Sequence, residues 1–228
     1  MDLLGDALED YISNRLKSPF LYHRHCIQKN YNGKIWEFDL ETCFRSWDKL
    51  WPLERKLINL SYGNILDIGS NTGYYIPYFM EKGTMGIEIS SKINNIARKR
   101  GLRNCVTGNF FTYKFKSRFD TVTLIGNDIA LAGTLYRLKK LLKKFDEILN
   151  KSGQVLLIIR HIRTLKYWHV VFTPHYNGQI GIPSKLLFLN TYFFSNFVLK
   201  YGFRATILGK NESTDYLHYL VRLVKSPR

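Results

Sequence analysis

ILDIGSNTGYYIPYF, residues 65–79, connects a short apolar run to an aromatic stretch through an acid and two spaced glycines. The apolar run is typical of a buried strand, and the glycines that follow it predict a turn. Gly69 and Gly73 can adopt backbone conformations that other residues avoid, and they let a ligand approach the main chain closely. Their spacing is G-x-x-x-G, with Asn71 where the dinucleotide fingerprint requires glycine. The stretch therefore predicts a ligand-binding turn that differs from the usual dinucleotide site.

The residues around this turn alternate between two kinds of pattern. Short apolar runs rich in β-branched residues, as in buried strands, recur at residues 64–68, 84–89, 104–107, 119–125 and 154–160. Helix-like stretches separate them, and the clearest is 134–149, where the apolar residues share one face and Thr134 can cap the start. Strands that alternate with helices predict right-handed crossovers and a mostly parallel sheet covered on both sides.

The C-terminal residues follow a different pattern. Residues 193–203 indicate a helix that ends at Gly202, and residues 203–208 and 215–224 indicate two strands joined by the polar sequence KNEST. Because a short turn joins antiparallel strands, we expect the sheet to end in a hairpin.

The N-terminal residues predict a segment that covers the main domain. Residues 2–16 have the apolar spacing of an amphipathic helix. Residues 18–52 lack clear periodicity and hold three of the four tryptophans, which predicts a loop-rich cap or lid held down by aromatic anchors. We therefore expect two parts, residues 1–60 as an N-terminal helix and cap and residues 61–228 as the domain that carries the glycine turn.

Composition places the chain among globular proteins of a reducing compartment. It has 228 residues, 45% of them hydrophobic, which is enough for one buried core. No stretch of about 18 apolar residues occurs, and the first ten residues carry acids where a secretory signal carries positive charge. The three cysteines are odd in number and widely spaced, which argues against a disulfide framework. The sequence thus predicts a cytoplasmic protein that does not span a membrane.

The charge distribution leaves two interpretations open. The formal net charge is +16, and residues 1–60 hold equal numbers of acidic and basic side chains, so the whole excess lies in residues 61–228. Between Ile89 and Phe119 there is no acid, and eight lysines and arginines are present. Such a basic stripe is able to steer a polyanion such as RNA. The alternative is an ordinary solvated surface.

Two acids restrict the ligand that the turn can hold. Asp67 places a carboxylate at the tip of the first strand, where it would repel a pyrophosphate but attract an ammonium or a sulfonium. Glu88 ends the next strand, where a carboxylate can accept both hydroxyl hydrogens of a ribose. Together these acids indicate a cationic ribonucleoside.

These residues and several later ones occur in the order known from one enzyme family. The segments that carry the likeness are residues 66–73, 86–90, 108–109, 119–122 and 152–155. Together they resemble the motifs of class I S-adenosylmethionine-dependent methyltransferases, and the resemblance covers about residues 62–224. It implies an α/β, Rossmann-like fold with a seven-stranded, mostly parallel sheet that ends in an antiparallel hairpin, preceded here by an N-terminal helical or loop cap. It also implies S-adenosylmethionine as the cofactor.

The resemblance assigns cofactor-binding roles to nine residues: Asp67, Gly69, Ser70, Asn71, Gly73, Glu88, Ile89, Asn109 and Phe110. Asp67 and the turn would face the methionine part, Glu88 would hold the ribose, Ile89 would lie against the adenine, and the residues after the third strand would meet the adenine edge. Two positions depart from the family. Asn71 replaces the middle glycine, and Asn109 replaces an acid, although its side-chain oxygen can still accept a hydrogen bond from an amino group.

The candidate catalytic residues are Asn127, Asp128 and His161. Methyl transfer is an in-line displacement that depends mainly on positioning, so a strict catalytic motif is not required. Residues 125–133, IGNDIALAG, resemble a group of small class I enzymes in which Asn127 and Asp128 would lie beside the transferring methyl; alternatively, they only shape a loop. His161 begins a long connection after the fifth strand and is the candidate base, with a surface or packing role as the alternative.

The sequence argues against two classes of nucleic-acid methyltransferase and against a metal site. IGNDIALAG is not the Asn/Asp-Pro-Pro-aromatic motif of enzymes that methylate flipped bases, and no cysteine follows the fourth or fifth strand, where a carbon-5 enzyme needs its nucleophile. No C-x-x-C or H-x-x-x-H pair supports zinc. The leading hypothesis is methyl transfer to a small molecule, with an RNA methyltransferase and a non-catalytic cofactor-binding protein as alternatives; the sequence leaves the oligomeric state open.

Overall fold

The computed structural model of the chain describes residues 2–26, 31–79, 83–212 and 217–226. At its centre is a seven-stranded sheet in the order β5 (Cys105–Thr107), β4 (Met85–Glu88), β3 (Ile65–Ile68), β6 (Phe119–Leu124), β7 (Leu149–His161), β12 (Leu217–Lys225) and β11 (Phe203–Glu212). Neighbouring strands from β5 to β7 are parallel, and β12 is antiparallel to β7 and to β11. This confirms the predicted mostly parallel sheet with a final antiparallel hairpin. Part of the KNEST turn lies outside the described residues.

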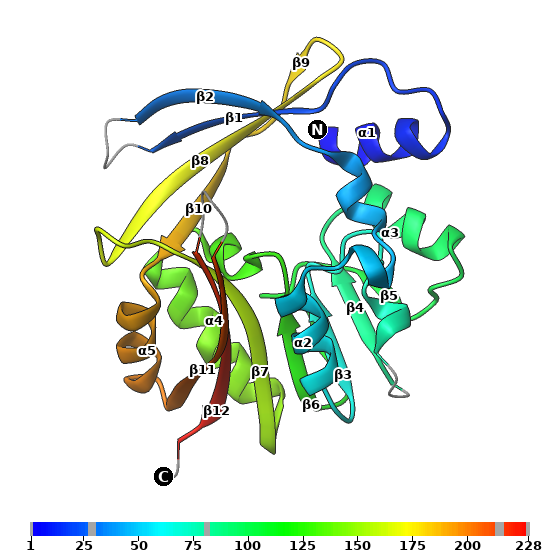
Figure 1. Cartoon of the computed structure of the whole chain (residues 1–228). Coiled ribbons are helices and arrows are strands. Elements are labelled where there is room, and N and C mark those ends of the chain that lie inside the picture. Colours follow the sequence, from blue (N-terminus) through cyan, green and yellow to red (C-terminus); the bar gives the residue numbers. More distant parts are fainter. Residues whose placement is uncertain (1, 27–30, 80–82, 213–216, 227–228) are drawn as a thin grey trace.

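Helices cover both faces of this sheet (Figure 1). α2 (Pro52–Leu60) packs on one face, against β7, β11 and β12. α4 (Leu135–Ile148) and α5 (Thr191–Leu199) cover the other face, and α3 (Ser91–Lys99) packs against β4 and β5. The predicted helix at 134–149 is confirmed within one residue, and Thr134 caps it by accepting a hydrogen bond from the Arg137 amide.

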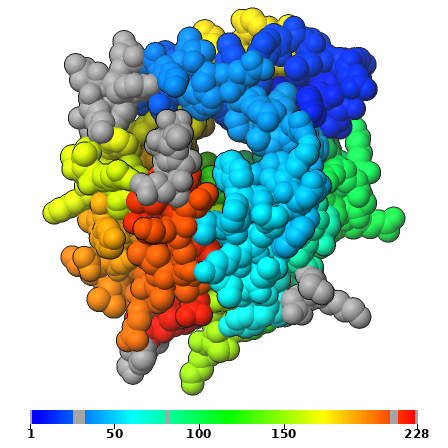
Figure 2. Space-filling model, viewed as in Figure 1, coloured from blue at the N-terminus to red at the C-terminus, as the bar shows by residue number. Residues whose placement is uncertain are grey.

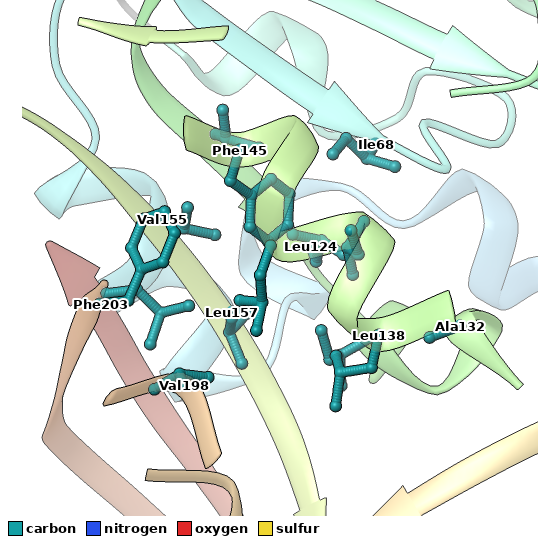
Figure 3. Close-up of a cluster of buried hydrophobic side chains, with 14 of the residues drawn as sticks. Ile68, Leu124, Ala132, Leu138, Phe145, Val155, Leu157, Val198 and Phe203 are labelled. Atoms are coloured by element: carbon teal, nitrogen blue, oxygen red, sulfur yellow. The ribbon is translucent and has the colours of Figure 1, made fainter. Parts of the chain in front are cut away.

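The main hydrophobic core lies between the sheet and helices α4 and α5. Leucine and phenylalanine side chains from α4 meet the inward side chains of β6 and β7, as Figure 3 shows for Leu138, Phe145, Leu124 and Leu157. All four are essentially buried. Burial of each side chain of this size contributes roughly 1.5–3 kcal/mol to the free energy of folding. The cluster therefore stabilises the packing of the central strands against α4 and α5.

Five further strands form an antiparallel extension, which we call the cap: β1 (Leu21–Cys26), β2 (Tyr31–Glu37), β8 (Tyr167–Tyr176), β9 (Gln179–Ile180) and β10 (Ser184–Leu189). The cap arches away from the top of β7 and passes over the upper edge of the central sheet (Figure 1). β10 joins it to β7 through the pairing of Leu189 with His161. The cap therefore combines an N-terminal hairpin with strands inserted between β7 and α5.

Two expectations about these segments were wrong. Residues 18–52 contain the strands β1 and β2 rather than only loops, and half of residues 160–179, the segment that His161 was expected to begin as a long connection, lies in β8. The strands escaped detection because both of their faces carry large or polar side chains, so apolar and polar residues do not alternate cleanly. Tyr22 and His23, for example, point to opposite faces of β1. Whether residues 1–60 are a unit separate from 61–228 stays a prediction, although β1 and β8 pair directly.

The N-terminal helix ties the cap to the main domain. α1 (Leu3–Ile12) is shorter than the predicted 2–16, and Asn14 beyond it has a positive φ of 53°. Asp2 caps α1 and also accepts a hydrogen bond from the Ser90 hydroxyl, at the start of α3. The Tyr176 hydroxyl at the end of β8 donates to Asp10 at 2.8 Å. Among the described residues, no helix is long and apolar enough to cross a membrane.

Candidate functional site

The glycine turn follows β3 directly, at the point where the strand order reverses between β3 and β6. Open α/β sheets bind ligands at such a point. Gly69 has a φ of +72°, and its amide and that of Ser70 both donate to the Ile87 carbonyl, at 2.9 and 3.2 Å. These two bonds fix the turn against the end of β4. The backbone of the turn is therefore held in place before any ligand arrives.

A cavity of about 530 Å³ opens beside this turn. Six of the predicted site residues line it: Gly69, Glu88, Ile89, Asn109, Phe110 and Asp128. Its far wall is residues 183–186, the start of β10, so the cap contributes directly to the site. The cavity thus lies between the carboxyl edge of the central sheet and the cap.

Asp67 lies in β3 beneath the turn and is only 2% exposed. Its Oδ1 accepts a hydrogen bond of 2.7 Å from the Thr123 hydroxyl, whereas its Oδ2 is buried and has no hydrogen-bond partner among the described residues. Burial raises the pKa of Asp67 to about 7, against the hydrogen bond from Thr123, and the charge of Glu88 raises it further. Asp67 is thus a buried acid, and no lysine or arginine among the described residues pairs with its ionised form.

Glu88 closes β4, with its carboxylate directed at the backbone of the turn. Its Oε2 accepts a hydrogen bond of 3.1 Å from the Asn71 amide, and its Oε1 accepts one of 2.9 Å from the Ser90 amide. Burial raises the pKa of Glu88, and these amides oppose the increase. Each carboxylate oxygen has a second lone pair for a ligand hydroxyl, so the predicted ribose role is compatible with this geometry.

Asp128 is a third carboxylate near the turn, and like Glu88 it lines the cavity. A Cβ atom placed on Gly69 would lie 3.4 Å from Asp128 Oδ2, so the acid faces the turn across a short gap. Burial raises the pKa of Asp128 well above its usual value, and the charges of Asp67 and Glu88 add to this. Among the described residues, none of the three acids forms an ion pair with a lysine or an arginine.

Asn127 does not line the cavity. It has a φ of +74° and follows Gly126, whose φ is +75°, so two successive left-handed residues turn the chain sharply after β6. Asparagine tolerates this conformation better than most residues. Its Oδ1 accepts a hydrogen bond of 2.9 Å from the Arg160 amide, which fixes the end of β7. Asn127 is therefore placed to position Arg160 rather than to contact a ligand in this cavity.

The remaining predicted turn residues face away from the cavity. The side-chain Nδ2 of Asn71 donates to Cys43 Sγ at 3.4 Å. The Ser70 hydroxyl is buried close to Gly86, and no described residue forms a hydrogen bond with it. A Cβ on Gly73 would lie 2.5 Å from Leu102 Cδ1, so glycine here permits close packing against the segment that leads into β5.

His161 also lies outside the cavity. Its Nδ1 is 3.1 Å from both the hydroxyl and the backbone nitrogen of Thr191, at the start of α5, and its ring packs edge-on against Tyr219. Burial and then Arg163 lower the pKa of His161. These contacts support the junction between β7 and α5.

Sequence reasoning missed several residues of the cavity wall, among them Leu131, Phe111 and Arg137. Leu131, in the turn after β6, is 50% exposed, and Ile89 is 70% exposed, so two large apolar side chains face the cavity. Phe111 and Arg137 also line the cavity. The guanidinium carbon of Arg137 lies 4.7 Å from the centre of the Phe111 ring. Exposed apolar residues next to buried acids suit a ligand with a flat ring at one end and a positive charge at the other.

Comparison with solved structures agrees with this arrangement. A SAM-dependent methyltransferase from Bacteroides fragilis, solved with S-adenosyl-L-homocysteine, matches 99% of this chain and 95% of its own with a TM-score of 0.84 and 21% identity. Because the match covers nearly the whole chain, it includes the cap. Neither a protein-family model nor a curated protein matches the sequence.

Two further structures match with lower scores. A sugar N-methyltransferase from Streptoalloteichus has a TM-score of 0.59 and 13% identity and covers 83% of this chain and 94% of its own. The glycopeptide N-methyltransferase MtfA, solved with S-adenosyl-L-homocysteine, has a TM-score of 0.56 and 15% identity and covers 77% of this chain and 86% of its own. With the strand order described above, these matches show that the chain has the class I S-adenosylmethionine-dependent methyltransferase fold.

Proposed function

We propose that this protein is a methyltransferase that uses S-adenosylmethionine and acts on a small molecule. The observation that carries the proposal is that Glu88 and Asp128 line one cavity while Asp67 is buried beneath the adjoining turn. All three acids have raised pKa values, and none forms an ion pair with a lysine or an arginine among the described residues. A ligand with an ammonium and a sulfonium would compensate these charges. A phosphate-rich dinucleotide would not.

The cavity suits each part of this cofactor. Glu88 would accept the ribose hydroxyls, and the exposed side chains of Ile89 and Leu131 would lie against the adenine. Asp67 and Asp128 would face the methionine part next to Gly69. When bound, the cofactor supplies a methyl group activated by its positive sulfur. The protein would then hold an acceptor in line with that methyl, since positioning supplies much of the rate acceleration in such displacements.

The small-molecule assignment rests on the enclosed site and on the matched proteins. The cap covers the cavity with residues of β10, as in sites that enclose a small ligand. The sugar and glycopeptide N-methyltransferases share the fold. Three of the eight basic residues between Ile89 and Phe119 are engaged within the protein, in contacts of Lys92 with Asp6, Arg100 with Thr72 and Arg118 with Leu149. These contacts weaken the alternative of an RNA-binding stripe.

The cofactor assignment is testable by thermal unfolding. At about 100 times their dissociation constants, S-adenosylmethionine and S-adenosylhomocysteine should raise the Tm by roughly 5–10 °C, and NAD should not. Asp67→Ala and Glu88→Ala should each reduce this shift, whereas Glu147→Ala, on the exposed face of α4, should leave it unchanged. Unchanged shifts in both site variants would exclude the assignment.

The acceptor class follows from a second measurement on the same protein. Radiolabelled S-adenosylmethionine is incubated with fractionated cell extract, and we expect label in the small-molecule fraction. Label in RNA would instead support the basic surface as an RNA site. Cofactor binding without label in any fraction would indicate a non-catalytic binding protein.

A further inference from the structure

One long segment of the chain carries no acid. Between Glu147 and Glu212 the sequence contains eight lysines and arginines and no aspartate or glutamate. The segment includes β7, the cap strands β8 to β10, and α5. Because these cations have no acidic neighbour along the chain, the surface is positive wherever they gather.

Within this segment, the turn between β7 and β8 and helix α5 enclose a groove of about 540 Å³. The turn contributes residues 163–166, and the other wall consists of side chains of α5 and of the residues next to it. Figure 2 shows the two segments side by side at the surface, in yellow-green and in orange. No described residue that lines the groove is acidic, and none also lines the cavity beside the glycine turn. The groove is therefore a second concave surface, separate from the proposed cofactor site.

Aromatic rings form one wall of this groove. Tyr192, in the first turn of α5, lines the groove and is 60% exposed. Phe193 and Phe197 also line it, and Tyr201 follows at the same spacing of four residues, with ring centres 5.9 and 5.0 Å apart along this row. An exposed ring at the edge of an aromatic groove is able to stack on a flat ligand.

Lysines flank these rings. Lys166 and Lys200 line the groove and are exposed, and neither forms an ion pair among the described residues. Beyond the groove, the Nζ atom of Lys139 in α4 lies 5.6 Å from the centre of the Tyr201 ring. Positive charge thus continues along the aromatic row, from the groove to α4.

We propose that this groove binds a short stretch of single-stranded nucleic acid, with a base stacked on Tyr192 and phosphates beside Lys166 and Lys200. Single-stranded nucleic acids combine flat rings with a regular series of negative charges, and proteins bind them with aromatic side chains set among cations. The groove presents both features within one concave surface. This inference concerns a second site and does not depend on the proposed methyltransferase function.

Two other anionic partners fit the groove less well. A lipid surface binds apolar side chains that project from a protein, whereas Phe193 and Phe197 line a hollow. A nucleic-acid duplex keeps its bases stacked inside, so it would use the lysines and leave Tyr192 without a ring to contact.

The test measures binding of fluorescent oligonucleotides of eight residues to the full chain by fluorescence anisotropy. The probes are one mixed sequence as single-stranded RNA, the same sequence as single-stranded DNA, and the corresponding duplexes. We expect a single strand to bind at least about tenfold more tightly than its duplex, and the better of the two single strands identifies the sugar that the groove accepts. With two phosphate contacts, its affinity should fall by at least about sevenfold from 50 to 200 mM salt.

Variants of the groove separate stacking from charge. Tyr192→Ala should weaken binding of the single strand by about tenfold or more, and Tyr192→Phe, which keeps the ring, should retain the wild-type affinity. Lys166→Gln and Lys200→Gln should each weaken it by about threefold in 50 mM salt and lower the slope of log K against log salt by about 0.7. Thermal unfolding of each variant checks that it is folded, and the lysine variants test the groove even if Tyr192→Ala is not.

Two matched controls change the same residue types elsewhere. Tyr136 of α4 is 66% exposed and lies beside Lys140, whose Nζ atom is 4.7 Å from its ring centre, but it does not line the groove. Lys99 is an exposed lysine at the end of α3, in the basic stretch between Ile89 and Phe119. Tyr136→Ala and Lys99→Gln should leave the affinity for the single strand unchanged.

Several outcomes would overturn the proposal. Equal affinity for the single strand and its duplex, or an unchanged affinity in Tyr192→Ala, would mean that no base stacks in the groove. Losses in Tyr136→Ala and Lys99→Gln as large as those in the groove variants would mean that overall surface charge explains the binding. A membrane contact would be indicated instead if Tyr192→Ala abolished sedimentation with phosphatidylserine vesicles and left oligonucleotide binding intact.

Discussion

At the scale of single residues, Asp67 is the most informative side chain of the chain. It is almost completely buried, one of its oxygens has no hydrogen-bond partner in the described part of the chain, and burial raises its pKa to about 7. A buried carboxylate of this kind destabilises the protein that carries it, so a structural role does not account for it. Residues with strongly shifted pKa values and a specific charged neighbour are typical of functional sites.

Replacement of Asp67 by asparagine should therefore stabilise the cofactor-free protein in a pH-dependent way. The pKa of Asp67 is higher in the folded state than the usual 3.8, so the folded protein holds more protons between these values and loses stability as the pH rises from about 4 to about 7. Asparagine does not titrate. The free energy of unfolding of Asp67→Asn minus that of the wild type should increase from pH 4.5 to pH 8, by on the order of a few kcal/mol.

Chemical denaturation at several pH values measures this difference. The same variant should bind S-adenosylmethionine more weakly at pH 8, because the positive ligand loses one counter-charge. A difference in unfolding free energy that stays constant across the pH range would show that Asp67 titrates normally in the folded protein.

Sequence reasoning identified the residues that sit at strand ends and missed those whose role depends on distant contacts. Asp67 and Glu88 are recognisable because each is an acid at or next to the end of an apolar run of the parallel sheet. The role of Asn127 depends on a hydrogen bond to Arg160, 33 positions later, and no local pattern reveals such a bond. The cofactor role of Gly73 stays a prediction, and the structure adds a reason for glycine that no local pattern reveals, because a Cβ there would lie 2.5 Å from Leu102 Cδ1.

At the scale of elements, a buried polar network joins the glycine turn to the N-terminal segment. Glu54 of α2 is fully buried, and its Oε1 accepts hydrogen bonds from Arg45 at 2.8 Å and from the Tyr75 hydroxyl at 2.6 Å. Its Oε2 accepts a third from the Trp51 amide. Arg45 follows the 3₁₀ turn η2 (Leu40–Phe44), and Tyr75 follows the glycine turn. Glu54 thus connects three elements around the site.

Loss of this carboxylate should destabilise the fold strongly. In Glu54→Ala the buried guanidinium of Arg45 loses its counter-charge, which typically costs about 3–5 kcal/mol. Glu147→Ala removes the acid of the exposed Lys144–Glu147 pair on α4 and should change stability by less than about 1 kcal/mol. Urea denaturation of both variants gives the comparison. Similar small losses in both would mean that the Arg45–Glu54 pair contributes no more than a surface pair.

The parallel strands and α4 could be predicted at this scale, and the cap strands could not. Strands buried on both faces are nearly continuous apolar runs, and α4 repeats its leucines at helical spacing. Strands β1 and β8 carry aromatic residues on one face and histidines on the other, a mixture that also occurs in loops. Their pairing depends on a partner strand far along the chain, which a local window does not contain.

At the scale of the whole molecule, the seven central strands are more protected from local opening than the five strands of the cap. The central strands are enclosed between helices on both faces, whereas the cap is covered by fewer elements and β2 forms its outer edge (Figure 1). Local opening is easiest where few buried contacts hold a strand. The cap, whose residues 183–186 line the cavity or border it, is therefore the part of the molecule best able to move.

Hydrogen exchange should show this gradient. Amides in β6 and β7 should exchange only through global unfolding, and those in β2 should exchange fastest among the strands. Saturation with S-adenosylhomocysteine should slow exchange at residues 69–73 and 87–89, next to the cavity, and leave β2 unchanged. Equal protection of β2 and β6 in the free protein would contradict the proposed gradient.

The pairing of β1 with β8 also determines when the site can form during synthesis. The Tyr176 hydroxyl accepts a hydrogen bond from the Lys17 amide, 159 positions earlier in the chain. As the ribosome releases the polypeptide from its N-terminus, the hairpin of β1 and β2 emerges long before the strand on which it docks. Contacts this distant in sequence delay folding, because the long intervening loop must close first. A nascent chain that ends before residue 167 would thus expose Tyr22 and Trp36 without their partner strand, and a chaperone that binds exposed aromatic strands would protect this intermediate.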